Sequence, residues 1–587
     1  MAATIEVSTT NQPAEQSVRL AVVLAVWGSF LLYSGVAAPV PAVNEPHYLC
    51  KAKHFWDPTW CANDFFLEST NAHTVFYSTI GALTNWFTLA QTAWAGRVIS
   101  LTILSIGWCA WLRPFTRCPW FPLHVAWLFL ALAACGNFSG EWLVGGVEGK
   151  VFSYGFLFAA IARLQARRIV SAGALAGLAV AFHPVIGVWG LLAVAGTWVI
   201  EHRLWRVRTW TQETGWRSEI IPTLSGLAAL VLCALPGLVP VFLLLAEPAP
   251  AQTKFAANFI QVYYRLAHHL DPMRFLPRAY LCYGLLLALW GFLIVRCRRS
   301  DAQRRLDLLV AAAVIFAVAG IIVGWGPRPA QLMTWYAQRA ALLKFYPFRL
   351  ADVLVPLAVA AAVANGLQGL NRRTAHRWVR LALIAMACWY VVFHPVGTPD
   401  KPESEVLSDP FRIGLAVGLL LFELGAAKWL ERCRPQFSLA LSYAMLFTVG
   451  LFVAHDNVEV SRYSGTLRTD WIDACEWIDQ QLPADALVHA PHNGWAFKWF
   501  GQRAEYVSFK DCPQNSEGIV EWNRRLNFLK RWFDQKYDDE FYSVDELRDL
   551  RAKTGITHIF TDRLGPLELE PIFKNGSFQV YDLTSLD

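Results

Sequence analysis

The chain has 587 residues, of which 55% are hydrophobic and only 16% are charged, and its mean hydropathy is +0.33. Soluble domains usually carry about 25% charged residues, so this composition excludes an ordinary soluble protein and indicates a membrane chain. The formal net charge of +6 does not indicate a nucleic-acid partner, because most arginines fall in short loops between apolar runs. The 12 cysteines form no CxxC or zinc-type spacing.

Apolar runs dominate the chain after a polar start. Residues 1–17 are predicted to form a cytoplasmic N-terminal tail, and 18–455 is predicted to be a membrane domain of about thirteen spans. The predicted spans are 18–40, 94–112, 121–136, 151–166, 169–183, 185–200, 219–245, 278–295, 307–325, 350–367, 379–394, 411–429 and 437–454. The short pair 169–183 and 185–200 could also be one broken hairpin, because proline at 184 interrupts a helix.

The basic residues predict the orientation of these spans. Arginines gather in alternate short loops, around 113–117, 163–168, 203–217, 296–305, 372–380 and 428–434. Short basic loops are cytoplasmic by the positive-inside rule. The remaining loops, 41–93, 137–150, 246–277, 326–349 and 395–410, are then predicted to face outward, as is everything after the last span.

The tail, 456–587, changes character and is predicted to be an extracytoplasmic α/β domain. Apolar residues recur at helical spacing in 470–481, and further helices are predicted at 518–536 and 543–554. Short β-branched and aromatic runs predict strands at 486–490, 505–509, 557–561 and 577–582. Strands that alternate with helices are typical of a partly parallel sheet.

The first outward loop, 41–93, is crowded with acids, imidazoles and aromatic side chains. Glu45 follows the first span closely, and Asp57 and Asp64 are set among aromatics, where desolvation favours a carboxylate as general base. His47 and His54 are candidates to bind phosphate or donate protons. The alternative is a loop of helix-capping acids and interfacial aromatics.

The second outward loop, 137–150, repeats this pattern. Glu141, Glu148 and Lys150 lie among five glycines at the start of a predicted helix. Glycine lets backbone approach a ligand closely, so we expect a substrate-binding role. The alternative is a flexible turn in which Glu148 caps the next helix.

Ligand-type side chains gather again in the third outward loop. Arg265, His268, His269 and Asp271 suit an anion such as phosphate, which the arginine fork binds in a bidentate manner. The two histidines and Asp271 could instead hold a metal ion. Arg349, at the start of the tenth span, is a second phosphate candidate. For each arginine the alternative is snorkelling to lipid headgroups.

Taken together, these features resemble integral-membrane glycosyltransferases of the GT-C superfamily, such as the oligosaccharyltransferase catalytic subunit, protein O-mannosyltransferases and lipid A aminoarabinose transferases. The resemblance is architectural and covers nearly the whole chain. Residues 44–49 also resemble the start of this loop in bacterial membrane proteins with no assigned activity. The resemblance implies a mainly α, polytopic membrane helix bundle with a C-terminal extracytoplasmic α/β domain.

The resemblance also implies a site. The family's acid near the start of the first loop, a base or metal ligand, corresponds to Glu45, with Asp57 or Asp64 as competitors, and the second-loop acid to Glu141 or Glu148. An adjacent acid pair, as in the O-mannosyltransferases, is absent because Asn44 precedes Glu45. A divalent metal ion stays open as a cofactor.

The implied activity is sugar transfer from a polyprenyl-phosphate donor to an acceptor on the outer face of the membrane, with the bacterial inner membrane as the expected location. The implied partners are the lipid-linked sugar and membrane lipid. Two alternatives remain: a lipid or polysaccharide transporter or flippase, and a non-catalytic envelope assembly protein. A transporter usually places acids within broken spans, and Asp352 and Glu423 are the only clear acids inside the predicted spans, which disfavours it.

Overall fold

The structure of the chain is a computed structural model. It describes residues 12–70, 72–134, 138–204, 216–296, 299–369, 417–418, 421, 425, 435–456, 463, 465–491, 494, 496–536, 540–562 and 566–586. The predicted span 379–394 and the predicted loop 395–410 lie outside the described residues, and the predicted span 411–429 lies largely outside them, including Glu423.

A helix lies at each predicted span that falls on described residues. Seven helices of the described chain are long and apolar enough to cross a membrane. They are α1 (Gln12–Ala37), α4 (Leu89–Leu112), α8 (Pro184–Leu204), α9 (Trp216–Leu245), α12 (Pro277–Arg296), α13 (Asp301–Gly324) and α15 (Arg349–Gly369). Shorter helices lie beside them: α5 (Phe121–Ala134), α6 (Gly149–Gln165), α7 (Ile169–Phe182) and α19 (Pro435–Asp456). The chain does break at Pro184, where α8 begins as a separate helix.

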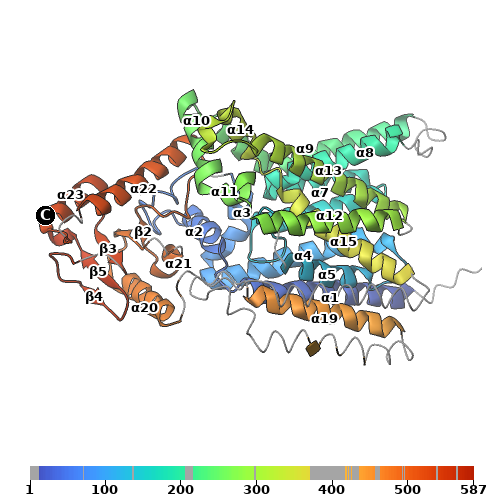
Figure 1. Cartoon of the computed structure of the whole chain (residues 1–587), viewed down its shortest axis with the longest axis horizontal. Helices are drawn as coiled ribbons and strands as arrows, with labels where there is room; N and C mark the ends of the chain where they lie inside the picture. The colour runs from blue at the N-terminus through green and yellow to red at the C-terminus, as the bar shows by residue number, and fades with distance from the viewer. Residues whose placement is uncertain are drawn as a thin grey trace, which may run out of the picture.

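These helices run roughly alongside one another as a bundle (Figure 1). Small residues allow the closest contacts, as is usual where helices cannot rely on burying apolar surface from water. A Cβ atom at Gly173 of α7 would lie 2.0 Å from the carbonyl oxygen of Gly226 in α9, so only glycine fits this crossing. Many large apolar side chains of α9 and α12 face outward, as expected for helices that contact lipid.

The first, third and fourth predicted outward loops contain short helices. The first contains α2 (Glu45–Trp56), α3 (Thr74–Thr79) and η2 (Ile80–Asn85). The third contains α10 (Ala251–Ile260), η4 (Gln261–Arg265), α11 (Ala267–Leu270) and η5 (Pro272–Arg274), and the fourth contains η6 (Ala330–Leu332) and α14 (Tyr336–Leu343). These short elements lie at the end of the bundle that faces the C-terminal part of the chain (Figure 1).

The tail forms a small domain built on a five-stranded sheet. Its strands are β1 (Leu487–His489), β2 (Ala504–Glu505), β3 (His558–Thr561), β4 (Phe573–Lys574) and β5 (Gln579–Asp582), in the order β2-β1-β3-β5-β4. The pairs β1–β2 and β1–β3 are parallel and the two pairs of β5 are antiparallel, so the sheet is partly parallel as predicted. Strand β2 is shorter than the predicted strand 505–509.

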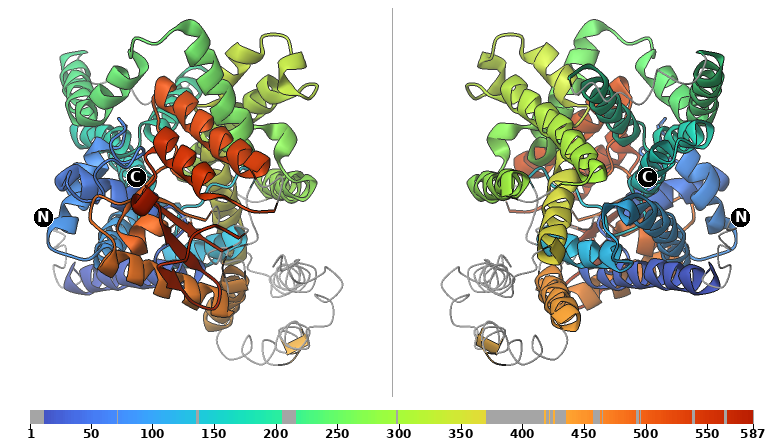
Figure 2. Two further views of the ribbon diagram at one scale, coloured as in Figure 1. Left: turned by 90° about the vertical axis from the view of Figure 1, so that its left-hand side faces the viewer. Right: turned by 90° about the vertical axis from the view of Figure 1, so that its right-hand side faces the viewer.

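Helices cover this sheet and connect it to the bundle. They are α20 (Gly465–Gln481), α21 (Phe497–Gly501), α22 (Ser516–Lys536) and α23 (Val544–Thr554), and α22 packs against α10 (Figures 1 and 2). One hydrophobic core runs from Leu49 and Phe76 of the first outward segment to Val488 and Phe578 of the sheet. The domain therefore sits on the first outward segment, at the mouth of the bundle.

Candidate functional site

A cavity of about 800 Å³ lies where the bundle, the outward loops and the C-terminal domain meet. This volume falls within the range of sites for small molecules, about 300–1,000 Å³. Its charged and histidine lining residues are Glu141, Glu148, Lys150, His268, His269, Arg278, Arg349, His455, Arg468 and Lys510. Six of the predicted substrate-binding residues are among them, so the structure brings the second loop, α11 and the start of α15 together.

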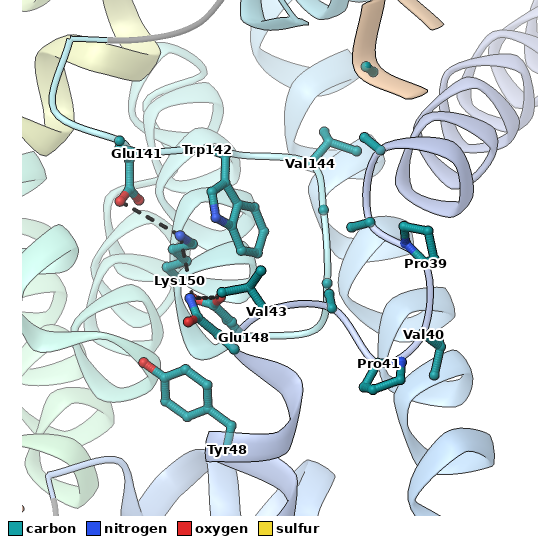
Figure 3. A pocket seen from close by; sticks show the side chains of 18 of the residues that line it. Pro39, Val40, Pro41, Val43, Tyr48, Glu141, Trp142, Val144, Glu148 and Lys150 are labelled. Carbon is teal, nitrogen blue, oxygen red and sulfur yellow. Dashed lines mark hydrogen bonds and ion pairs between the residues drawn. The ribbon is translucent and has the colours of Figure 1, made fainter. Parts of the chain in front are cut away.

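The centre of this lining is Lys150, in the first turn of α6. Its Nζ lies 3.7 Å from Glu141 Oε2 and 3.4 Å from Glu148 Oε2, and both carboxylates are almost fully buried (Figure 3). The same Nζ lies 3.6 Å from the centre of the Trp142 ring. Asn44 Nδ2 donates to Glu148 Oε1 at 2.7 Å. The ion pairs of Lys150 are longer than hydrogen bonds, so its ammonium can turn toward a bound anion.

Arg349 is the second cation of this centre. Its Nε lies 3.2 Å from Glu141 Oε2, and its guanidinium stacks 3.7 Å above the Tyr346 ring. A further guanidinium nitrogen lies 3.4 Å from His183 Nε2. Arg349 therefore pairs with a buried carboxylate and lines the cavity.

Asp352, one turn further along α15, holds the second outward loop in place. Its carboxylate accepts hydrogen bonds from the backbone N–H groups of Phe138 and Ser139, from the Ser139 hydroxyl and from the N–H of Glu141. Gly140 has φ of +80°, and a Cβ there would lie 2.5 Å from the His269 ring, so the turn requires glycine. This clamp fixes where the Glu141 carboxylate points.

None of the three predicted catalytic acids lines this cavity. Glu45 begins α2 and is fully buried, where Arg97 of α4 donates to both of its oxygens, at 2.8 and 2.9 Å. The backbone N–H groups of Ala42 and Val147 also donate to it, at 2.8 and 2.9 Å. Its lone pairs are engaged by four donors, an arrangement that ties α2, α4 and the second loop together.

Asp64 belongs to a buried charge cluster that joins the first outward segment to the C-terminal domain. Lys498 Nζ of α21 lies 3.5 Å from Asp64, 3.0 Å from Glu505 and 2.7 Å from Asp511; these four residues are here called the Lys498 cluster. Asp64 also accepts from the N–H groups of Phe66, Leu67 and Glu505. Burial raises the pKa of Glu505 to about 7.

The other first-loop candidates also lie away from the cavity lining. Asp57 is exposed and caps its own turn through Thr59. His47 bonds Asp511 through Nδ1 at 2.8 Å, and burial lowers its pKa. His54 Nδ1 lies 2.8 Å from the Trp60 carbonyl oxygen.

In the third loop, the predicted cluster divides. His268 and His269 line the cavity, while Asp271 pairs with Arg328 and caps the Met273 N–H. Arg265 does not line the cavity, but it donates at 2.6 Å to the carbonyl oxygen of Lys510, which does. Among the described residues, no group of three or more histidines, cysteines and acids is placed to hold a metal ion, so His268, His269 and Asp271 do not form the metal site left open above.

The partner of Glu45 and several residues of the cavity lining escaped the sequence analysis. Arg97 is a charged residue inside an apolar run, which is itself a signal because such residues are costly in a membrane. Asn44 and Tyr48 line the cavity from the same segment as Glu45. They are four positions apart, so a helix that begins here places them on one face, and this spacing was the available signal. Arg468 and Lys510 come from the tail, and no local pattern distinguishes them.

Comparisons with known proteins support the fold. A family model described as "Domain of unknown function (DUF6798)" matches residues 469–529. Among curated protein sequences, none matches the chain. Two solved structures of ArnT from Cupriavidus metallidurans, in the apo state and bound to undecaprenyl phosphate, are similar to it at 16% identity and a TM-score of 0.51, with 98% of this chain and 99% of that chain covered. The chain therefore has the fold of these ArnT structures, and the seven apolar helices of spanning length among its described residues identify it as an integral membrane protein.

Proposed function

We propose that the chain is a membrane glycosyltransferase that moves a sugar from a polyprenyl-phosphate donor to an acceptor outside the cytoplasm. The observation that carries this proposal is the cavity with two buried carboxylates and two cations, Lys150 and Arg349, at the junction of membrane helices and outer domain. The likeness of the whole chain to ArnT, which was solved with undecaprenyl phosphate bound, supports a lipid phosphate as ligand.

The reaction needs one base and one anion site. The acceptor hydroxyl oxygen forms a bond to the anomeric carbon while the bond from that carbon to the phosphate oxygen breaks. The electron pair leaves with the phosphate, and the hydroxyl proton passes to a carboxylate. A positioned base typically contributes about 10²–10⁴ in rate, and cations near the phosphate stabilise the charge that develops on it.

The contacts suggest which residue takes each role. Glu141 faces both Lys150 and Arg349, so it is suited to positioning these two cations. Among the described residues, Glu148 contacts one cation, Lys150, and the neutral amide of Asn44, so we propose Glu148 as the general base. Lys150 and Arg349 would hold the phosphate. In this proposal the first-loop acids Glu45 and Asp64 support the fold rather than react.

The expected setting follows from the orientation of the basic loops. We propose the bacterial inner membrane, with the C-terminal domain and the cavity outside the cytoplasm. A long-chain lipid donor would reach the cavity sideways from the bilayer, so that only its phosphate and sugar leave the hydrocarbon.

A transfer assay with purified protein and a panel of polyprenyl-phosphate sugars tests the proposal. We expect one donor to support transfer and Glu148→Gln to lower the rate about 10²–10⁴-fold. Asp57→Asn is the matched control, because it makes the same acid-to-amide change at an exposed position. Transfer at the wild-type rate in Glu148→Gln would remove Glu148 as base, and no turnover or binding with any donor would reject the function.

A further inference from the structure

The first and second outward loops meet in the cavity through the side chains of two helix N-caps. Asn44 precedes α2 and Glu148 precedes α6, and neither side chain caps its own helix. An N-cap side chain normally accepts from the N–H of the second or third residue of its helix, but the second residue of α2 is Pro46, which has none. The Asn44 amide is instead turned to Glu148, and its Nδ2 donates to Glu148 Oε1 at 2.7 Å.

This contact fixes the orientation of the Asn44 amide. An ionised carboxylate only accepts hydrogen bonds, so the amide atom that faces Glu148 must be the nitrogen. The amide oxygen, Oδ1, then points elsewhere, and no donor reaches it among the residues that the structure describes. Because Asn44 lines the cavity, this oxygen is an acceptor that a bound molecule can use.

Tyr48 lies one turn further along α2 and also lines the cavity (Figure 3). Positions four apart share one face of a helix, so Tyr48 lies on the same side of α2 as Asn44. In the described part of the chain its hydroxyl has no hydrogen-bond partner. Burial, followed by the charge of Glu148, raises the pKa of Tyr48 well above its usual value, so the phenol keeps its proton at pH 7 and can donate as well as accept. Asn44 and Tyr48 are here called the α2 face.

The buried carboxylate of Glu45 holds the α2 face against Glu148. Glu45 directly follows Asn44, and it accepts at 2.9 Å from the N–H of Val147, which directly precedes Glu148. A Cβ atom at Gly146 would lie 3.1 Å from Glu45 Oε1, so the second loop passes close to this carboxylate. The backbone is therefore fixed on both sides of the bond between Asn44 and Glu148. Such support by neighbouring groups is typical of binding residues.

The chemistry of the α2 face suits the hydroxyl groups of a neutral sugar. An amide oxygen accepts from a hydroxyl, and a phenol accepts from one or donates to one. Neither group carries a charge that would balance an ammonium or carboxylate substituent, and Glu148 is already paired with Lys150.

We propose that Asn44 and Tyr48 are specificity-determining residues, which bind hydroxyl groups of the transferred sugar, and that this sugar is neutral. This inference rests on the proposed function, because it places the sugar beside the proposed base, Glu148, while Lys150 and Arg349 hold the phosphate.

The test measures how much the sugar adds to the binding of the lipid. The full-length protein in phosphatidylcholine nanodiscs is titrated with undecaprenyl methyl phosphate, which has the charge of the donor but no sugar. It is then titrated with undecaprenyl phosphate that carries glucose, galactose, mannose or, as the charged probe, glucosamine. The ratio of the dissociation constant of the methyl ester to that of the lipid-linked sugar is called the sugar increment.

Asn44→Ala and Tyr48→Phe are compared with Asn85→Ala and Tyr336→Phe, which make the same changes at exposed positions outside the cavity lining. We expect at least one hexose to bind more tightly than the methyl ester. Each variant of the α2 face should lower that sugar increment about three- to tenfold, the range for one net hydrogen bond. Affinity for the methyl ester should not change, and both control variants should keep the wild-type increment.

Three results would overturn the α2 face as the sugar site: no increment with any hexose, an unchanged increment in both of its variants, or an equal loss of affinity for the methyl ester. A larger increment for glucosamine than for every hexose would overturn a neutral sugar. Failure of every lipid to bind the wild-type protein would overturn the proposed function instead.

Discussion

The Glu45–Arg97 ion pair can be broken by one nearly isosteric substitution, Glu45→Gln. Both side chains are fully buried, and the carboxylate accepts from two guanidinium nitrogens and two backbone N–H groups. A glutamine keeps one oxygen but places an amide N–H₂ against groups that are all donors. Removing one partner of a buried ion pair typically costs about 3–5 kcal/mol, because the other charge stays buried without compensation.

The expected result is therefore lower stability with retained chemistry. Unfolding followed by tryptophan fluorescence in detergent should give a lower midpoint for Glu45→Gln than for Asp57→Asn, which changes an exposed acid in the same way. Transfer activity per folded molecule should stay near wild type. The double variant Glu45→Gln/Arg97→Gln removes both charges and should recover part of the lost stability, since the two sites are coupled.

Two outcomes would refute this reasoning. A wild-type unfolding midpoint in Glu45→Gln would mean that the buried pair does not stabilise the fold as its geometry indicates. A wild-type midpoint together with loss of transfer would return the role of base to Glu45 and leave Glu148 as a supporting residue.

Three further predictions concern the loop clamp, the Lys498 cluster and the topology. Asp352→Asn should lower the transfer rate at least about tenfold in a steady-state assay. The amide cannot accept from all the donors that orient Glu141, and each unsatisfied donor costs about 1–3 kcal/mol. Unchanged kinetics would show that the contacts of Asp352 do not position Glu141 for transfer. Glu505 has a pKa raised from 4.5 to about 7, so between these values the folded chain keeps a proton that the unfolded chain releases, and stability falls as pH rises. The stability of Glu505→Gln minus that of wild type should therefore grow from pH 4.5 to 7, by roughly 3 kcal/mol at most, and level off above. A difference that does not vary with pH would contradict the assignment. Reporter fusions after Arg299 and after Gly465 should report opposite sides of the membrane, and a cytoplasmic signal from Gly465 would reverse the predicted side of the C-terminal domain.

The second outward loop shows which residues of the candidate site could be predicted from the local sequence. Glu141, Glu148 and Lys150 were recognisable because acids, a lysine and glycines occur within ten residues, at the start of an apolar run. Glycines there permit the turn at Gly140, and the helix that follows presents Lys150 in its first turn. The contact between Glu141 and Arg349 was not recognisable, because these residues lie far apart in the chain.

The sequence by itself determined the membrane helices. A helix satisfies its backbone hydrogen bonds between residues four positions apart, and a helix with apolar side chains is stable in the hydrocarbon of a bilayer, so an apolar run of sufficient length predicts a membrane helix. It also indicated the sheet domain, whose strands and helices follow local patterns. Only the tertiary structure decided which groups surround the first-loop acids. The partner of Glu45 lies 52 positions away in α4, and a backbone donor to Asp64 lies 441 positions away in the sheet domain. Whether a buried carboxylate is a base or part of the framework depends on which donors reach it, and those donors come from segments that only folding brings together.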